Sequence, residues 1–203
     1  MIIPAILEES LNELKTKIEL FNNTAPLVHI DIGDGMFVKL KPNFTPQQAA
    51  ELFPLVMFQI HLMCLNPVDY ISDKYPNIKA VIFQAETEEN YLKTAEYFKR
   101  LGFEVGLCVN LETPAPEYLE NIDFIQFMAI VPGAQQNKFD ASVVQKIFTF
   151  HKLFPDVPIQ IDGGINNINI LELKKAGAIN FAVGSYILKS EKPLETYKEL
   201  CGI

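Results

Sequence analysis

The stretch Leu27-Val28-His29-Ile30-Asp31 is an apolar, strand-like run that carries a histidine and an aspartate at its carboxyl end. Two further runs have the same form, Phe58-Gln59-Ile60-His61-Leu62-Met63 and Pro158-Ile159-Gln160-Ile161-Asp162-Gly163-Gly164. The chain has three histidines, and two of them fall in these runs. In a parallel α/β barrel the carboxyl ends of the strands meet at one mouth, where the chemistry takes place. The runs therefore predict two imidazoles and two carboxylates at one mouth, a ligand set suited to a divalent metal.

The length and composition are those of one globular domain over residues 1–203. The 203 residues are 49% hydrophobic and 21% charged, which allows a sizeable core but only short loops in a (β/α)8 barrel. A net charge of -8 disfavours a nucleic-acid partner, because a phosphate backbone attracts a basic face. No apolar run approaches the roughly 20 residues of a membrane span, and the N-terminus shows no signal-peptide pattern. We therefore expect a cytoplasmic protein with no membrane partner.

The cysteines agree with a reduced compartment. Cys64, Cys108 and Cys201 are too few and too scattered to form a disulfide framework. We interpret all three as buried, inert thiols.

Short β-rich runs alternate with helical patterns along the whole chain. Strands are predicted over residues 2–7, 27–31, 55–62, 79–83, 104–109, 124–128, 157–162 and 180–183. Helices are predicted over 11–21, 46–53, 68–72, 88–101, 141–154, 168–176 and 194–200, with room for only a short helix in 115–120. Several strands are continuous apolar runs, which is typical of strands covered by helices on both faces. Eight such units favour a closed parallel (β/α)8 TIM barrel. An open doubly wound sheet is the alternative, although the first βα turn lacks a dinucleotide fingerprint.

His29 and Asp31 are two residues apart, so their side chains point to the same face of a strand. That face must be the barrel interior if both are to reach one metal. A lone inward histidine is usually a hydrogen-bonded core residue. A His-x-Asp pair at a strand end, followed by Gly33-Asp34-Gly35, favours metal binding or catalysis instead.

Three loops at the same mouth contain small residues. Gly163 and Gly164 permit a tight turn whose N–H groups could face an anion. Gly184 and Ser185 follow the eighth strand, where such barrels commonly bind phosphate. The loop at 132–136 is either a lid or an ordinary surface loop, and the glycine pairs could also be ordinary turns. Met63 and Met128 close two strands at this mouth, and we interpret them as packing residues rather than ligands.

Taken together, these stretches resemble ribulose-phosphate 3-epimerase over nearly the whole chain. Pro4-Ala5-Ile6-Leu7 is similar to the family's Pro-Ser-Ile-Leu, and the block from His29 to Val38 is similar to its His-x-Asp-x-Met-Asp-Gly-x-Phe-Val. His61-Leu62-Met63, Asp162-Gly163-Gly164-Ile165 and the segment from Gly177-Ala178 to Gly184-Ser185 match three further motifs. The combination is specific, whereas each piece alone is not.

The resemblance implies a metal-dependent isomerase of carbohydrate metabolism, in the pentose phosphate pathway. His29, Asp31, His61 and Asp162 would bind one divalent ion per chain, either Zn, Fe, Mn or Co. Asp31 and Asp162 would be the acid/base pair acting on a small-molecule sugar phosphate, a ketopentose 5-phosphate. The residues implied in substrate and phosphate binding are His61, Gly133, Gly163, Gly164, Gly184 and Ser185. The resemblance leaves the oligomeric state open, including a homo-oligomer.

Four departures from the family pattern lie in the substrate shell. Ala5 replaces a substrate-contacting Ser, Gly33 replaces a Met, and Gln84 replaces the His of a His-x-Glu motif that keeps Glu86. In the loop at 132–137, Gln135 and Gln136 replace two glycines that help to cradle phosphate.

Three hypotheses follow. The first is an epimerase that interconverts D-ribulose 5-phosphate and D-xylulose 5-phosphate. The second is an epimerase of a ketohexose 6-phosphate such as allulose 6-phosphate. The third is a non-catalytic protein that binds a sugar phosphate or a metal. A decarboxylase or aldolase of the orotidine-phosphate decarboxylase group is set aside, because the stretch from Asp31 to Gly35 contains no Lys where that group has one.

Overall fold

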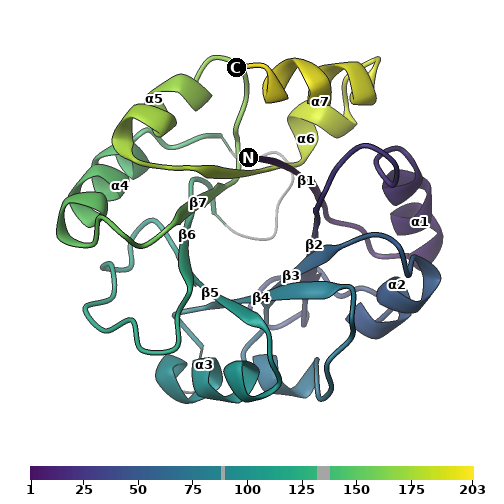
Figure 1. Cartoon of the computed structure of the whole chain (residues 1–203), viewed down its shortest axis with the longest axis horizontal. Coiled ribbons are helices and arrows are strands. Elements are labelled where there is room, and N and C mark those ends of the chain that lie inside the picture. The colour runs from purple at the N-terminus through teal and green to yellow at the C-terminus, as the bar shows by residue number, and fades with distance from the viewer. Residues whose placement is uncertain (88–89, 132–137) are drawn as a thin grey trace.

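Eight parallel strands close into a barrel in the order of the chain, from β1 to β8, and β8 pairs with β1 (Figure 1). The computed structural model describes residues 1–87, 90–131 and 138–203. The strands are β1 Ile2–Ile6, β2 Val28–Gly33, β3 Phe58–Met63, β4 Ile78–Gln84, β5 Glu104–Val109, β6 Phe124–Met128, β7 Ile159–Asp162 and β8 Asn180–Val183. The closed barrel confirms the predicted (β/α)8 architecture and excludes the open sheet.

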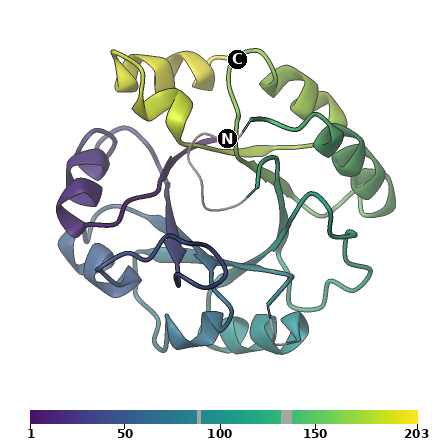
Figure 2. The same cartoon turned by 180° about the vertical axis from the view of Figure 1, so that it is seen from behind.

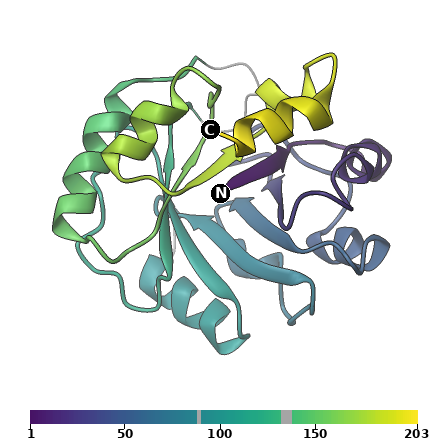
Figure 3. The same ribbon diagram turned by 45° about the horizontal axis from the view of Figure 1, so that its top comes forward.

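Helices surround the barrel, as both end-on views show (Figures 1 and 2). They are α1 Leu11–Glu19, α2 Pro46–Leu52, the 3-10 helix η1 Pro67–Asp69, α3 Tyr91–Arg100, α4 Ser142–Leu153, α5 Ile170–Ala176, α6 Ser185–Leu188 and α7 Pro193–Cys201. Helices α1 and α2 each begin at a residue whose side chain caps them. Ser10 accepts a hydrogen bond from the backbone N–H of Glu13, and Thr45 forms a capping box with Gln48. The last helix, α7, packs on β1, so the two ends of the chain lie close together (Figure 3).

The predicted helix at 115–120 is wrong. The connection from β5 to β6, all of which is described, contains turns and bends but no helix. Pro114 and Pro116 explain the difference, because proline disfavours the α conformation in the residue before it and donates no backbone hydrogen bond. The predicted helix at 68–72 is the shorter 3-10 helix η1, and the helix predicted from 88 starts at Tyr91, with Asn90 as its N-cap. Residues 88–89 lie outside the described part of the chain.

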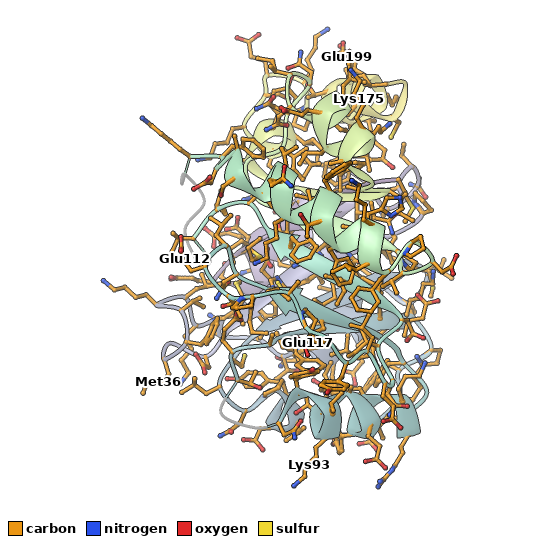
Figure 4. All side chains as sticks on the ribbon, turned by 90° about the vertical axis from the view of Figure 1, so that its left-hand side faces the viewer. Met36, Lys93, Glu112, Glu117, Lys175 and Glu199 are labelled. Atoms are coloured by element: carbon orange, nitrogen blue, oxygen red, sulfur yellow. The ribbon has the colours of Figure 1, made fainter. Side chains whose placement is uncertain are left out.

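Strand register decides which side chains meet inside the barrel. His29 on β2 lies beside Gln59 on β3, and Asp31 lies beside His61. Side chains alternate between the two faces of a strand, so all four of these side chains enter the barrel. Loops that follow the strands form the mouth above them. Figure 4 shows Met36 and Glu112, from the loops after β2 and β5, at the same edge of the molecule.

Two of the three thiols are buried, as predicted. Cys64 and Cys108 are fully covered, whereas Cys201 at the end of α7 is exposed, so the prediction is wrong for that residue. All three cysteines are free, which agrees with the expected lack of a disulfide framework. None of the helices in the described part of the chain has the length and apolarity that a membrane crossing needs.

Candidate metal centre

Two imidazoles and two carboxylates from three strands converge inside the barrel, toward its mouth. His29 and Asp31 come from β2, His61 from β3 and Asp162 from β7. One ligand atom from each residue lies within 4.8 Å of every other. Both imidazoles are fully buried, and each aspartate is 8% exposed at the mouth of the barrel. The structure thus brings together the four residues that the sequence selects as metal ligands.

The distances fit a single small cation. Asp31 Oδ1 lies 2.8 Å from His61 Nδ1 and 3.2 Å from His29 Nε2. Asp162 Oδ2 lies 3.5 Å from His61 Nδ1 and 3.7 Å from His29 Nε2. Four ligands at about 2.1 Å from a tetrahedral ion are about 3.4 Å apart, and the four distances lie on both sides of that value. The cluster can therefore hold one divalent ion, with mixed nitrogen and oxygen ligands.

The cluster is also balanced electrostatically. Burial raises the pKa of Asp31, but the neighbouring His29 and His61 outweigh burial and hold that pKa well below its ordinary value. Burial lowers the pKa of His61, whereas Cys108 and the two carboxylates raise it, and the net pKa lies well above its ordinary value. Since burial raises the pKa of Cys108, that thiol is neutral near pH 7 and the carboxylates carry the effect. A positive charge is thus favoured between the two carboxylates.

Four buried glutamines adjoin this cluster. Gln59 Nε2 is 2.7 Å from His29 Nδ1, and Gln84 Nε2 is 2.9 Å from His61 Nε2. Gln160 donates to Gln126 Oε1 at 2.7 Å, and Gln126 donates in turn to Asp162 Oδ2 at 3.2 Å. Sequence reasoning noted Gln84 only as a departure and missed the other three. The signal was present, because Gln59 and Gln160 each stand two residues before a predicted ligand and so face the same way.

Asp34 organises the loop after β2. Its Oδ1 accepts from the backbone N–H groups of Met36 and Phe37, both at 2.7 Å, and its Oδ2 accepts from Leu65 N–H at 2.8 Å. Partial burial opposes ionisation, but these N–H groups outweigh it and lower the pKa of Asp34. Asp34 therefore ties the loop after β2 to the loop after β3, beside the metal ligands.

The structure shows the surroundings of two residues that depart from the family motifs, Gly33 and Ala5. A Cβ atom at Gly33 would lie 2.4 Å from the carbonyl oxygen of Leu40, so the folded-back loop leaves no room for a Met side chain. Ala5 lies beside His29 in the register of β1 and β2. A Cβ atom at Gly184 would lie 3.1 Å from Ala5 O, so Ala5 also adjoins the start of the loop after β8.

The glycines of the predicted phosphate loops lie at the mouth. Gly163 and Gly164 have φ values of 104° and 66°, in the left-handed region that favours glycine, so the turn itself requires them. Asn169 donates to Gly164 O at 3.0 Å and fixes this turn. Gly184 precedes the short helix α6, which begins at Ser185. Gly133 lies outside the described residues.

The two methionines are buried beside the cluster. Met128 pairs in register with Asp162, and Met63 pairs with Gly33. Both are at most 3% exposed. Their placement agrees with a packing role at the mouth.

The fold and the cluster define a TIM barrel with a histidine and aspartate centre, and comparison with known proteins gives its family. The model of the ribulose-phosphate 3 epimerase family matches residues 1–188, and the chain belongs to this family. Ribulose-phosphate 3-epimerase from Helicobacter pylori is 29% identical over 203 residues, covering 94% of this chain and 91% of that protein. The cytoplasmic isoform of ribulose-phosphate 3-epimerase from Oryza sativa is 29% identical, covering 87% and 81%. These relatives are named as epimerases, which are isomerases, and family membership supports a sugar-phosphate epimerase.

Solved structures agree on the fold. The chain is similar to 3-hexulose-6-phosphate synthase from Salmonella typhimurium, with a TM-score of 0.71 and 14% identity over 99% of this chain and 96% of that one. A mutant tryptophan synthase α-subunit from Pyrococcus furiosus gives a TM-score of 0.71 and 16% identity, with coverage of 100% and 98%. At these identities the likeness shows the barrel fold alone.

Replacing Asp34 by Asn should destabilise the protein by about 1–2 kcal/mol near pH 7, because an amide nitrogen cannot accept the N–H of Leu65. The pKa of Asp34 is lower in the folded protein than in the unfolded chain. The ionised carboxylate therefore stabilises the fold fully above the unfolded-state pKa of about 3.9, and this stabilisation is lost as the pH falls through the lower, folded-state pKa. Urea unfolding of parent and variant from pH 7 to pH 3 measures this. Asp156→Asn, at an exposed position, is the control. An equal stability difference between parent and Asp34→Asn at pH 7 and pH 3 would contradict the assignment.

Proposed function

We propose that the protein is a metal-dependent epimerase of a phosphorylated ketose, which interconverts D-ribulose 5-phosphate and D-xylulose 5-phosphate. The observation that carries the proposal is the placement of Asp31 and Asp162. Their strands, β2 and β7, are separated around the barrel by β1 and β8 on the shorter side, yet both carboxylates face the same cluster. Inversion at a carbon needs a proton taken from one face and returned to the other, and two carboxylates on different sides of a substrate supply both steps.

The proposed epimerisation is a pair of proton transfers and needs no oxidant or reductant. One aspartate takes the proton from the carbon next to the ketone, and the electron pair of that C–H bond forms the enediolate. The other aspartate starts protonated and gives its proton to the opposite face, so one turnover moves the proton from one carboxyl group to the other, and the two exchange roles in the reverse direction. The lowered pKa of Asp31 keeps its carboxylate ionised at neutral pH, as a proton acceptor must be. His29, Asp31, His61 and Asp162 would hold one divalent ion, which when bound would act as a Lewis acid that stabilises negative charge on the substrate oxygens.

The phosphate of the substrate belongs at the loops after β7 and β8. We assign its binding to backbone N–H groups near Gly163, Gly164, Gly184 and Ser185, with Gly133 as a further contact. These loops lie at the same mouth as the cluster, and small residues let a dianion approach the backbone. Met63 and Met128 limit the space beside the sugar. We place the protein in the cytoplasm, by analogy with the isoform that the Oryza sativa relative's name describes.

One observation supports a ketohexose 6-phosphate as an alternative substrate. Ala5 lies beside both His29 and Gly184, where the family motif has a serine, so a hydroxyl donor is missing between the metal cluster and the loop after β8. A pocket built without that donor discriminates less strictly for its usual substrate. A ketohexose 6-phosphate is therefore the alternative substrate.

Protein purified without chelator should contain about one divalent ion per chain, and the His61→Ala variant should lose most of it. Removing His61 deletes one of four ligands and leaves two carboxylates with a single imidazole. Since a metal ligand imidazole is neutral and the pKa of His61 is raised, binding releases protons and should weaken as pH falls. Elemental analysis of both proteins measures the content, with His151→Ala on the outer helix α4 as control. Equal metal in parent and His61→Ala would remove His61 from the site.

The Asp162→Asn variant should lower turnover of ribulose 5-phosphate by about 10²–10⁴, the usual contribution of a general acid or base. An assay coupled to a xylulose 5-phosphate-consuming enzyme measures the rate. Metal content must be determined on the same samples, because Asp162 is also a proposed ligand. Ordinary activity in metal-replete Asp162→Asn would exclude Asp162 from proton transfer, and no activity in the metal-replete parent on either sugar phosphate would support the non-catalytic alternative.

The Ala5→Ser substitution should raise kcat/KM for ribulose 5-phosphate by about 2- to 13-fold, since one hydrogen bond to substrate is worth about 0.5–1.5 kcal/mol. Parent and Ala5→Ser are compared on ribulose 5-phosphate and on allulose 6-phosphate. Ala5→Val is the control for bulk without a hydroxyl. If Ala5→Ser leaves the pentose rate unchanged and the parent turns over the hexose efficiently, the second sugar replaces the first.

A further inference from the structure

The two imidazoles of the cluster face the carboxylates with different ring nitrogens. For His29 the nitrogen that faces Asp31 and Asp162 is Nε2, and for His61 it is Nδ1. The nitrogens on the far side, His29 Nδ1 and His61 Nε2, lie 2.7 Å from Gln59 Nε2 and 2.9 Å from Gln84 Nε2, and Gln126 Nε2 is more distant from His61 Nε2, at 3.5 Å. Each ring thus lies between the metal cluster and one buried carboxamide.

Cation binding fixes the proton on each ring. A neutral imidazole that gives one nitrogen to a metal carries its only N–H on the other nitrogen, and that N–H needs an acceptor. Gln59 lies within hydrogen-bond distance of this nitrogen in His29, and Gln84 lies within hydrogen-bond distance of it in His61. A carboxamide can meet this need, because a half-turn of the amide exchanges its donor nitrogen and acceptor oxygen at almost constant shape.

The amide oxygen of Gln84 is an unused hydrogen-bond acceptor among the described residues. In its present orientation the nitrogen Nε2 faces His61, and Oε1 is buried with no hydrogen-bond partner among the described residues. A buried carbonyl oxygen without a hydrogen-bond partner destabilises the protein. A half-turn of the amide would direct Oε1 to the N–H of His61 and give this oxygen a donor. Gln126 Nε2 lies 3.4 Å and 3.5 Å from the two nitrogens of the same ring, but a half-turn of this amide would break two bonds, because Gln160 donates to its oxygen and its nitrogen donates to Asp162.

We propose that Gln59 and Gln84 are positioning residues that select the tautomers of the two metal-binding histidines. Their amide oxygens accept the N–H at His29 Nδ1 and at His61 Nε2, which leaves His29 Nε2 and His61 Nδ1 free to bind the cation. This inference rests on the proposed metal site. It gives the family departure at Gln84 a role of its own, since the side chain at that position contacts a ligand histidine rather than solvent.

Nitrogen-15 spectroscopy of the zinc-loaded protein tests the tautomers directly. The chain has three histidines, and the His151→Gln variant assigns the third, so long-range ¹H–¹⁵N correlations identify the remaining two rings. We expect the proton of His29 on Nδ1 and the proton of His61 on Nε2. A zinc-bound ring with the opposite tautomer would overturn the proposal for that residue and leave the metal site standing. A parent protein that binds no zinc would overturn the metal site and this inference together.

Substitutions separate an acceptor role from simple packing. Gln59→Met and Gln84→Met keep the side-chain length and remove the acceptor, and each should weaken zinc affinity by about 10- to 100-fold in competition with a chelating dye. Gln84→Glu retains an acceptor oxygen and should keep the parent affinity. Gln47→Met, on the outer helix α2, is the matched control, because its amide donates to Tyr70 O outside the barrel. If Gln84→Glu binds zinc as weakly as Gln84→Met, Gln84 does not act as an acceptor.

Discussion

Two carboxylates can be buried at the mouth of this barrel only because two imidazoles lie within reach of them. Asp31 Oδ1 is shared by His61 at 2.8 Å and His29 at 3.2 Å, and this contact joins adjacent strands β2 and β3 at their carboxyl ends. Asp162 reaches the same imidazoles from β7, on another part of the wall. An unpaired buried carboxylate would be costly, so the four residues depend on one another. Strand register sets this mutual arrangement, and the chemistry proposed for the site follows from it.

The polar interior extends beyond the four residues. Gln59, Gln84, Gln126 and Gln160 fill positions where many barrels place branched apolar side chains. Their amides connect three of the four ligand residues to neighbouring strands by hydrogen bonds of 2.7–3.2 Å. Such a layer restrains ring orientation more strongly than apolar packing does, because a hydrogen bond has a preferred direction.

Two departures from the family motifs lie close to the ligands, at Gly33 in β2 and at Ala5 in β1. Gly33 leaves room for the carbonyl of Leu40, and Asp34 holds the following residues through backbone N–H groups. The aspartate of the family motif at position 34 therefore supports the loop and does not join the metal cluster. On the opposite side of β2, Ala5 leaves the neighbourhood of His29 without a hydroxyl group. The ligand set is complete, while the surroundings of the substrate differ from the family motifs.

The sequence by itself determined the eight strands, their parallel order and the four residues at their ends. Apolar runs ending in His29, Asp31, His61 and Asp162 carry that information locally, because strand periodicity fixes which side chains share a face. The prediction of a helix from the sequence failed at residues 115–120, where two prolines prevent the helix that chain spacing alone allowed. Only the tertiary structure decided which ring nitrogen of each histidine faces the carboxylates, and that Gln59 and Gln84 stand behind them. Those facts depend on the register between strands and on side-chain rotation. The contacting residues lie 30 and 23 positions apart in the chain, so no local sequence pattern encodes their contact.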